Sequence, residues 1–237
     1  MGGVPRGAGR PRRRWTTLER DLRRAGGELI AGVDEVGRGS LAGPVVACAI
    51  IMPPNARALR GVDDSKVLPA IERRRLARLI LDRALAAGLG AASVEEIDRL
   101  NIYHATTLAM RRAIARLRLS PDQILIDGRP IRTLGLSHIA VVDGDDKCFS
   151  IACASIIAKV TRDRLMGSLA ARYPAYAWES NVGYGTPAHL AALRECGSCG
   201  HHRRRFVARV LGECDHGPPL EDHLLSEPVT PTVQQHM

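Results

Sequence analysis

Acidic side chains follow three separate apolar segments of this sequence, at points where strands of a sheet would end. Asp34 and Glu35 follow the first segment, Asp127 follows the second, and the acidic run 143–146 follows the third. Because strand ends converge in sheets covered by helices, we expect these carboxylates to lie close together. Close carboxylates repel one another unless they share protons or cations, and Mg²⁺ and Mn²⁺ take oxygen ligands of this kind. The pattern therefore predicts a divalent-metal site.

Such a site suits the hydrolysis of a phosphodiester. Two ions about 3.5–4 Å apart can hold the attacking water and the leaving oxygen without a protein nucleophile. Taken alone, Asp34, Asp127 or Asp145 could equally be an ordinary turn or cap residue. That alternative weakens when the three are considered together. Asp143 and Asp146 flank Asp145, and spacing alone does not decide which of them is the ligand.

Apolar periodicity predicts the elements that would carry these acids. Strands are expected at 29–33, ended by Asp34, and at 45–51, 124–126 and 139–142. Helices are expected over 70–87, 103–117 and 150–170. Strands interleaved with helices predict the α/β class, with a mixed sheet covered on both faces.

Two of the predicted helices carry further detail. In the first helix Ile71, Leu76, Leu79 and Ile80 share one face, and Gly88 would end it. The third helix begins with small residues, which would let it lie close on the sheet.

The charge distribution predicts a nucleic-acid partner. Lys and Arg outnumber Asp and Glu by 34 to 25, a net charge of +9. We expect residues 1–28 (eight Arg, three acids) to be a basic disordered arm and residues 213–237 (five acids, no Lys or Arg) an acidic disordered tail. The remaining segment 29–212 holds 26 bases and 17 acids, again +9, so the basic bias belongs to the expected catalytic domain. With only 3% aromatic residues, a duplex gripped by its backbone fits better than stacked single strands.

Other features exclude some classes of protein. The longest apolar stretch, 45–52, is too short to cross a bilayer, so we expect a cytoplasmic protein without a membrane partner. We also expect a monomer, because no feature of the sequence requires an oligomer. Cys196-x-x-Cys199 followed by Cys214-x-His216 leaves a zinc site as an alternative.

Residues 31–44, Ala-Gly-Val-Asp-Glu-Val-Gly-Arg-Gly-Ser-Leu-Ala-Gly-Pro, resemble the opening signature of bacterial ribonuclease HII, a type 2 ribonuclease H. Similar matches follow in order over about residues 29–210: Asp64-Ser65-Lys66, Leu100-Asn101-Ile102, Ile126-Asp127-Gly128, Gly144-Asp145, the run 154–163, Gly183-Tyr184-Gly185-Thr186 and His202-Arg203-Arg204.

The resemblance implies a ribonuclease H-like mixed β-sheet flanked by helices on both faces, with a helical C-terminal part. It implies an endoribonuclease that cuts the RNA strand of RNA·DNA hybrids, including single ribonucleotides embedded in duplex DNA, and leaves 5′-phosphate and 3′-hydroxyl ends. The implied ligands of Mg²⁺ or Mn²⁺ are Asp34, Glu35, Asp127 and Asp145, the last selected by its pairing with Gly144.

The resemblance also implies a set of substrate-reading residues: Gly37, Arg38, Gly39, Ser65, Lys66 and Tyr184. The two glycines would let the backbone test a sugar for its 2′-hydroxyl, and the tyrosine ring would pack on the next deoxyribose. The sequence departs from the family's common His-Lys-Gly-Tyr form at Asn181-Val182, which we expect to alter phosphate contacts. Two other hypotheses stay open: a resolvase- or integrase-like nuclease, and a non-catalytic nucleic-acid-binding module.

Overall fold

The computed structural model describes residues 15–62 and 68–212. Its centre is a five-stranded sheet with the order β3-β2-β1-β4-β5. The strands are β1 (Ile30–Val36), β2 (Val45–Ile51), β3 (Ala86–Ala92), β4 (Gln123–Asp127) and β5 (Ile139–Val141). Antiparallel pairs join β1 to β2 and β2 to β3, whereas β1 to β4 and β4 to β5 are parallel pairs. The predicted mixed sheet is confirmed.

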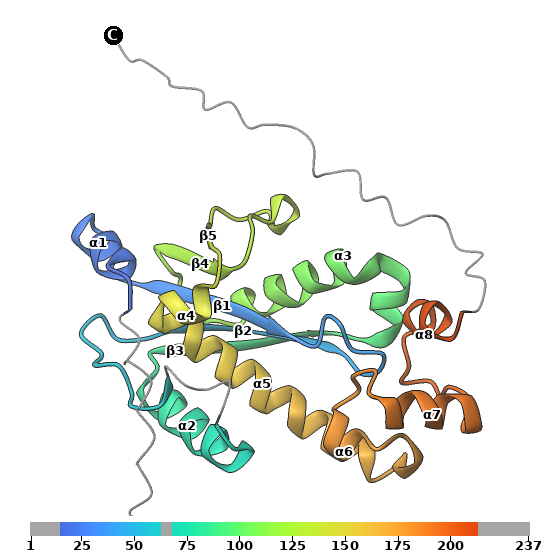
Figure 1. Ribbon diagram of the computed structural model, residues 1–237. Coiled ribbons are helices and arrows are strands. Elements are labelled where there is room, and N and C mark those ends of the chain that lie inside the picture. Colours follow the sequence, from blue (N-terminus) through green and yellow to red (C-terminus); the bar gives the residue numbers. More distant parts are fainter. Residues whose placement is uncertain (1–14, 63–67, 213–237) are drawn as a thin grey trace, which may run out of the picture.

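Helices cover both faces of this sheet (Figure 1). α3 (Val94–Ala115) packs on one face of the sheet, against Ala47 and Ala49 of β2. α5 (Phe149–Ala170) and α2 (Ala70–Arg83) pack on the other face, against Cys48 and Ile50. Successive side chains of a strand point to opposite faces, so β2 is buried along its whole length.

α5 lies especially close to the sheet, as its small residues predict. A Cβ built on Gly32 of β1 would stand 2.3 Å from the backbone carbonyl carbon of Ser150. No side chain larger than hydrogen fits there, which makes Gly32 the contact point between β1 and α5.

The predicted helix over 70–87 is too long. α2 ends at Arg83, and the residues that follow form β3, which pairs with β2. Its glycines serve close packing and do not end a helix: a Cβ on Gly90 would stand 2.0 Å from the Ala109 carbonyl oxygen of α3. The prediction that Ile71 lies on the buried face of the helix is also wrong, because 66% of Ile71 is exposed at the start of α2.

α3 begins nine residues before the predicted start at 103. Ser93 caps it, since its hydroxyl accepts from the Glu96 N–H and its own N–H donates to the Glu96 carboxylate. The helix is interrupted at Asn101, whose φ is +67°. The Asn101 side chain accepts from the His104 N–H at 3.1 Å and so caps the second half of α3.

The boundary of the folded part lies before residue 29, because α1 (Leu18–Arg24) packs against the N-terminus of α5. Glu19 of α1 is buried and accepts hydrogen bonds from the Phe149 and Ser150 N–H groups at 2.9 and 3.1 Å. The Trp15 ring meets the Phe149 ring edge-on at 5.7 Å. The prediction of a disordered arm is therefore wrong for residues 15–28. Residues 1–14 and 213–237 lie outside the described part of the chain.

The helical C-terminal part consists of α6 (Trp178–Asn181), α7 (Pro187–Cys196) and α8 (Arg204–Leu211). These helices surround a separate apolar cluster that includes Trp178, Leu193 and Val207 and that also takes in Leu41 from the loop after β1. The short helix α4 (Gly144–Lys147) joins β5 to α5. Within residues 15–62 and 68–212, no helix is both long and apolar enough to span a membrane.

Candidate active site

Asp34 and Asp127 lie on the adjacent parallel strands β1 and β4. The register pairs Val33 with Ile126, so Asp34 and Asp127 follow side by side. The sequence predicted that Asp34 ends the first strand. This prediction is wrong, because β1 continues to Val36. Only 6% of Asp34 is exposed, and burial together with the charges of Glu35 and Asp127 raises the pKa of its carboxyl well above the ordinary value. A hydrogen bond with Ser155 of α5 opposes that rise in pKa.

Glu35 belongs to the same acidic group but has a basic neighbour. The Arg38 Nη1 lies 3.2 Å from Glu35 Oε1. Burial raises the pKa of Glu35, the contact with Arg38 lowers it, and the charge of Asp127 raises it again. The influence of Asp127 on both β1 carboxyls places the three acids in one electrostatic environment.

Asp145 lies one residue beyond a backbone contact with Asp127. The Gly144 N–H donates to Asp127 Oδ1 at 2.6 Å, and Asp145 is the next residue, in the first turn of α4. Asp145 is half-buried, whereas the Asp143 side chain is 72% exposed and lies 4.0 Å from Lys147 Nζ. Asp146 is half-buried as well, so these positions set Asp143 apart but do not separate Asp145 from Asp146.

A metal ion would find suitable donors here, although they are not yet converged on one point. Carboxylate oxygens are the ligands that hard divalent cations prefer. The pKa of Asp34 is raised first by burial and then by the charges of Glu35 and Asp127, and a bound cation would stabilise its ionised form against both. In the part of the chain that the structure describes, no three His, Cys, Asp or Glu side chains are arranged to hold a metal ion. The donor set therefore fits in kind, and binding would require the side chains to turn toward a common point.

The loop after β1 contains Gly37, Arg38 and Gly39. Gly37 has φ +91°, and a Cβ there would stand 2.1 Å from Arg162 Nε, so only glycine fits. Gly39 is exposed, and a Cβ at this position would meet no atom within 4 Å. The loop therefore offers open space beside the acidic group.

Two buried arginines hold this loop from beneath. Arg162 and Arg203 are both 0% exposed. Arg203 donates to the carbonyls of Gly37, Arg38 and Gly43 at 2.6, 2.8 and 2.9–3.0 Å. Burial lowers the pKa of Arg203 to about 9, which leaves it charged at neutral pH. Both arginines lie in the matched motifs, the run 154–163 and His202-Arg203-Arg204, but nothing in the sequence marks their side chains as buried.

Tyr184 lies half-buried in the loop between α6 and α7. Its ring centroid is 5.6 Å from the Arg162 guanidinium carbon, and its carbonyl is 2.9 Å from His189 Nδ1. Asn181 is buried and braces this loop, since it donates to the Tyr176 carbonyl and accepts from the Gly183 N–H, both at 2.8 Å. Asn181 thus has a structural role, because both contacts are with nearby backbone. The expected change in phosphate contacts stays a prediction.

The remaining predicted residues have different outcomes. Ser65 and Lys66 lie outside the described residues. Cys196 and Cys199 are free thiols, Cys199 Sγ lies 3.3 Å from His202 Nδ1, and Cys214 and His216 lie outside the described residues. The described members of the alternative zinc site, Cys196 and Cys199, belong to no metal-holding group within the described residues.

The fold and the acidic group define the class of this protein: it is a nuclease with the ribonuclease H-like fold. The ribonuclease H2 from Pyrococcus horikoshii OT3 superposes with a TM-score of 0.67 at 28% identity, over 77% of this chain and 96% of that one. The Bst-RNase HIII structure in complex with Mn²⁺ gives a TM-score of 0.60 at 20% identity, over 79% of this chain and 70% of that one.

The family follows from the sequence comparisons. The Ribonuclease HII model matches residues 31–210. Ribonuclease HII of Granulibacter bethesdensis is 55% identical over 189 residues, which is 78% of this chain and 86% of that protein. The chain belongs to the ribonuclease HII family, and its activity is that of a ribonuclease H, a hydrolase of RNA in RNA–DNA hybrids.

Proposed function

We propose that this ribonuclease H also cuts at single ribonucleotides embedded in duplex DNA and leaves 5′-phosphate and 3′-hydroxyl ends. The observation that supports this proposal most directly is an open glycine loop, Gly37-Arg38-Gly39, next to the buried Asp34 of β1 and the half-buried Asp127 of β4. Because Gly39 has space where a side chain would stand, a sugar can approach the backbone closely enough for its 2′-hydroxyl to be read.

In this proposal Asp34, Glu35, Asp127 and Asp145 hold two divalent cations, Mg²⁺ or Mn²⁺. When bound, such ions activate a water and stabilise the leaving oxygen. Mn²⁺ is the ion named for the Bst-RNase HIII complex of the same fold. Ser155 orients the Asp34 carboxyl, and the Gly144 N–H orients that of Asp127.

The substrate-reading set completes the proposal. Gly37, Arg38 and Gly39 read the ribose, and Ser65 and Lys66 contact a phosphate. Tyr184 packs on the deoxyribose beyond the ribonucleotide, and the cation beneath its ring leaves the opposite face for a sugar. We further propose that the protein acts as a cytoplasmic monomer on RNA·DNA hybrids and ribonucleotide-containing duplexes. Membership of a nuclease family disfavours the non-catalytic alternative, and the Ribonuclease HII match disfavours the resolvase- or integrase-like one.

The first experiment compares three duplexes in Mg²⁺ and in Mn²⁺: one with a single ribonucleotide, one all-DNA, and one continuous RNA·DNA hybrid. Cleavage of the first and third duplexes, with none of the second, is expected. Asp34→Asn and Asp127→Asn should each abolish cleavage, because an amide is a poor ligand for these ions, while circular dichroism shows the parental fold. Activity within tenfold of the parent in either variant would contradict the proposed metal site.

A second experiment tests the glycine loop alone. Gly39→Ala meets no atom in the free protein, so its stability should equal that of the parent. Its cleavage should fall by about a hundredfold, because a methyl group displaces the sugar by about 1 Å or more. Gly200→Ala is the matched control, since a Cβ there also meets no atom within 4 Å. Equal activity of the two variants would show that the sugar does not approach at Gly39.

A further inference from the structure

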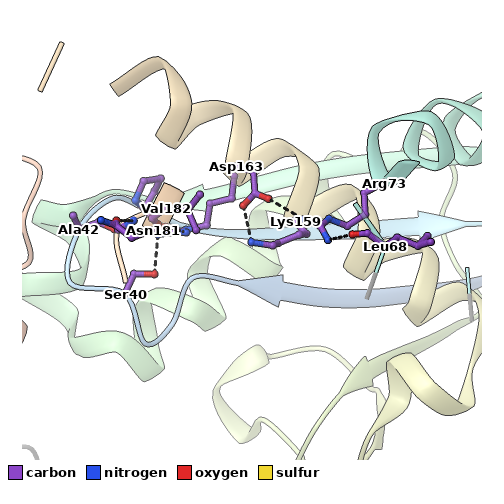
Figure 2. Close-up of polar contacts among 11 residues, drawn as sticks. Ser40, Ala42, Leu68, Arg73, Lys159, Asp163, Asn181 and Val182 are labelled. Carbon is purple, nitrogen blue, oxygen red and sulfur yellow. Dashed lines mark hydrogen bonds and ion pairs between the residues drawn. The ribbon is translucent and has the colours of Figure 1, made fainter. Parts of the chain in front are cut away.

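Arg162 occupies an unusual position on α5 for a charged residue. Its guanidinium group is buried and donates four hydrogen bonds, all to uncharged acceptors. The acceptors are the carbonyls of Pro44, Ala42 and Val182, at 2.9, 3.0 and 2.9 Å, and the Ser40 hydroxyl at 2.8 Å. Figure 2 shows Ser40, Ala42 and Val182 gathered beside α5.

These acceptors belong to two separate loops. We name residues 37–44, after β1, the sugar loop, and residues 182–184 the tyrosine loop. Arg162 bonds the sugar loop through three acceptors and the tyrosine loop through Val182, and its guanidinium lies beneath the Tyr184 ring. The loops also meet directly, since the Leu41 N–H donates to the Gly183 carbonyl at 2.8 Å. Arg162 therefore spans the junction between the two loops.

Arg203 provides a natural comparison. It is equally buried, but its four hydrogen bonds go to carbonyls of the sugar loop alone. A change at Arg203 therefore loosens the sugar loop, whereas a change at Arg162 also alters the position of the tyrosine loop relative to it.

We propose that Arg162 is a specificity-determining positioning residue, which sets the spacing between the ribose-reading sugar loop and the ring of Tyr184. The inference rests on the proposed function, in which the two loops read successive sugars. It requires no contact between Arg162 and the substrate. Through this spacing, Arg162 makes cleavage depend on a ribonucleotide followed by a deoxyribonucleotide.

The chemistry of the side chain supports a geometric role. A buried cation without a carboxylate partner stabilises a fold poorly, because its desolvation offsets much of the gain from its hydrogen bonds. Burial accordingly lowers the pKa of Arg162. The planar guanidinium donates in fixed directions to several acceptors at once, which the single ammonium of a lysine does not reproduce. Arginine is thus suited to hold two loops at a set distance.

The test measures kcat and KM of the full chain on the single-ribonucleotide duplex and on the continuous RNA·DNA hybrid. In Arg162→Lys, kcat on the single-ribonucleotide duplex should fall about tenfold more than kcat on the hybrid, with KM changed less than about threefold. Arg203→Lys should lower both rates by the same factor. The double variant Arg162→Lys with Tyr184→Ala should discriminate no worse than Tyr184→Ala alone, because both changes remove the same contact.

One result would overturn the inference: a folded Arg162→Lys variant with the parental ratio of the two rates, whether both rates are unchanged or both fall by the same factor. If Arg162→Lys does not fold by circular dichroism, Ser40→Ala removes one acceptor and should shift the ratio by about threefold. A parental ratio in Ser40→Ala would then overturn it. The proposed function fails separately, when the parent protein does not cut the single-ribonucleotide duplex.

Discussion

Acid should destabilise this protein through two buried histidines that are held in the neutral form. The Cys199 N–H donates to His202 Nδ1 at 3.0 Å, so the proton of His202 is on Nε2, 3.0 Å from His189 Nε2. Trp178 Nε1 donates to the same His189 nitrogen at 3.1 Å, which leaves His189 Nδ1 to donate to the Tyr184 carbonyl. A second proton on either ring would break one of these hydrogen bonds.

The magnitude follows from the pKa of His202. Burial and the neighbouring His189 lower it from the ordinary 6.5 to about 4. Above pH 6.5 neither the folded nor the unfolded state is protonated at this site. Below pH 6.5 His202 binds a proton in the unfolded state, but in the folded state it does so only near pH 4. Stability is therefore lost as the pH falls from 6.5 to about 4. At about 1.4 kcal/mol per pH unit, the largest loss from His202 is about 3 kcal/mol.

The assay is denaturant unfolding between pH 7.5 and 4.5 in the presence of a chelator. His202→Asn should lower stability at pH 7.5, because it removes hydrogen bonds. Between pH 6 and 4.5 its free energy of unfolding should fall less steeply than that of the parent, by about 1 kcal/mol per pH unit. His104→Asn, at an exposed position of α3, is the control and should keep the parental slope. Equal slopes in His202→Asn and the parent would refute the reasoning.

Two further predictions concern packing and the N-terminus. Gly90→Ala should lower the free energy of unfolding by about 3 kcal/mol or more in denaturant titrations, because its Cβ would lie 2.0 Å from the Ala109 carbonyl oxygen; a parental midpoint would contradict the close contact. Removal of residues 1–14, which hold five arginines, should reduce the salt dependence of hybrid binding, by at most about 4.5 in the log–log slope, without changing stability. Removal of residues 1–25 should also cost about 1–2 kcal/mol of stability, because Glu19 is lost.

The sequence predicted those elements whose local pattern and tertiary role agree. β2 and α5 have the predicted bounds to within one residue, because a β-branched run and a long apolar helix are recognisable locally. β3 was missed because its residues, Ala-Ala-Gly-Leu-Gly-Ala-Ala, contain no β-branched side chain. Its strand form depends on pairing with β2 and on the close approach of α3, which are tertiary contacts.

The acids of the candidate site were recognisable, but the residues that position them were not. Asp34 and Asp127 stand out as acids next to apolar runs, and the strand register brings them side by side. Arg203 stands in a run of charged residues that usually indicates a solvated surface. Only the structure shows that its guanidinium is buried against carbonyls 160 residues earlier in the chain. Glu19 was hidden for the same reason, since its partners are 130 residues away.

α5 links the carboxylates to the loops that surround them. Ser155 of this helix bonds to Asp34, and Arg162 follows seven residues later, about 10 Å along the axis at 1.5 Å per residue. Three of the four acceptors of Arg162 are backbone carbonyls, which any residue provides. The side chain at 182 can therefore change, as it has in this chain, without loss of the contact that holds the tyrosine loop. Ser155 and Arg162 have no such freedom, because these contacts depend on their own side chains.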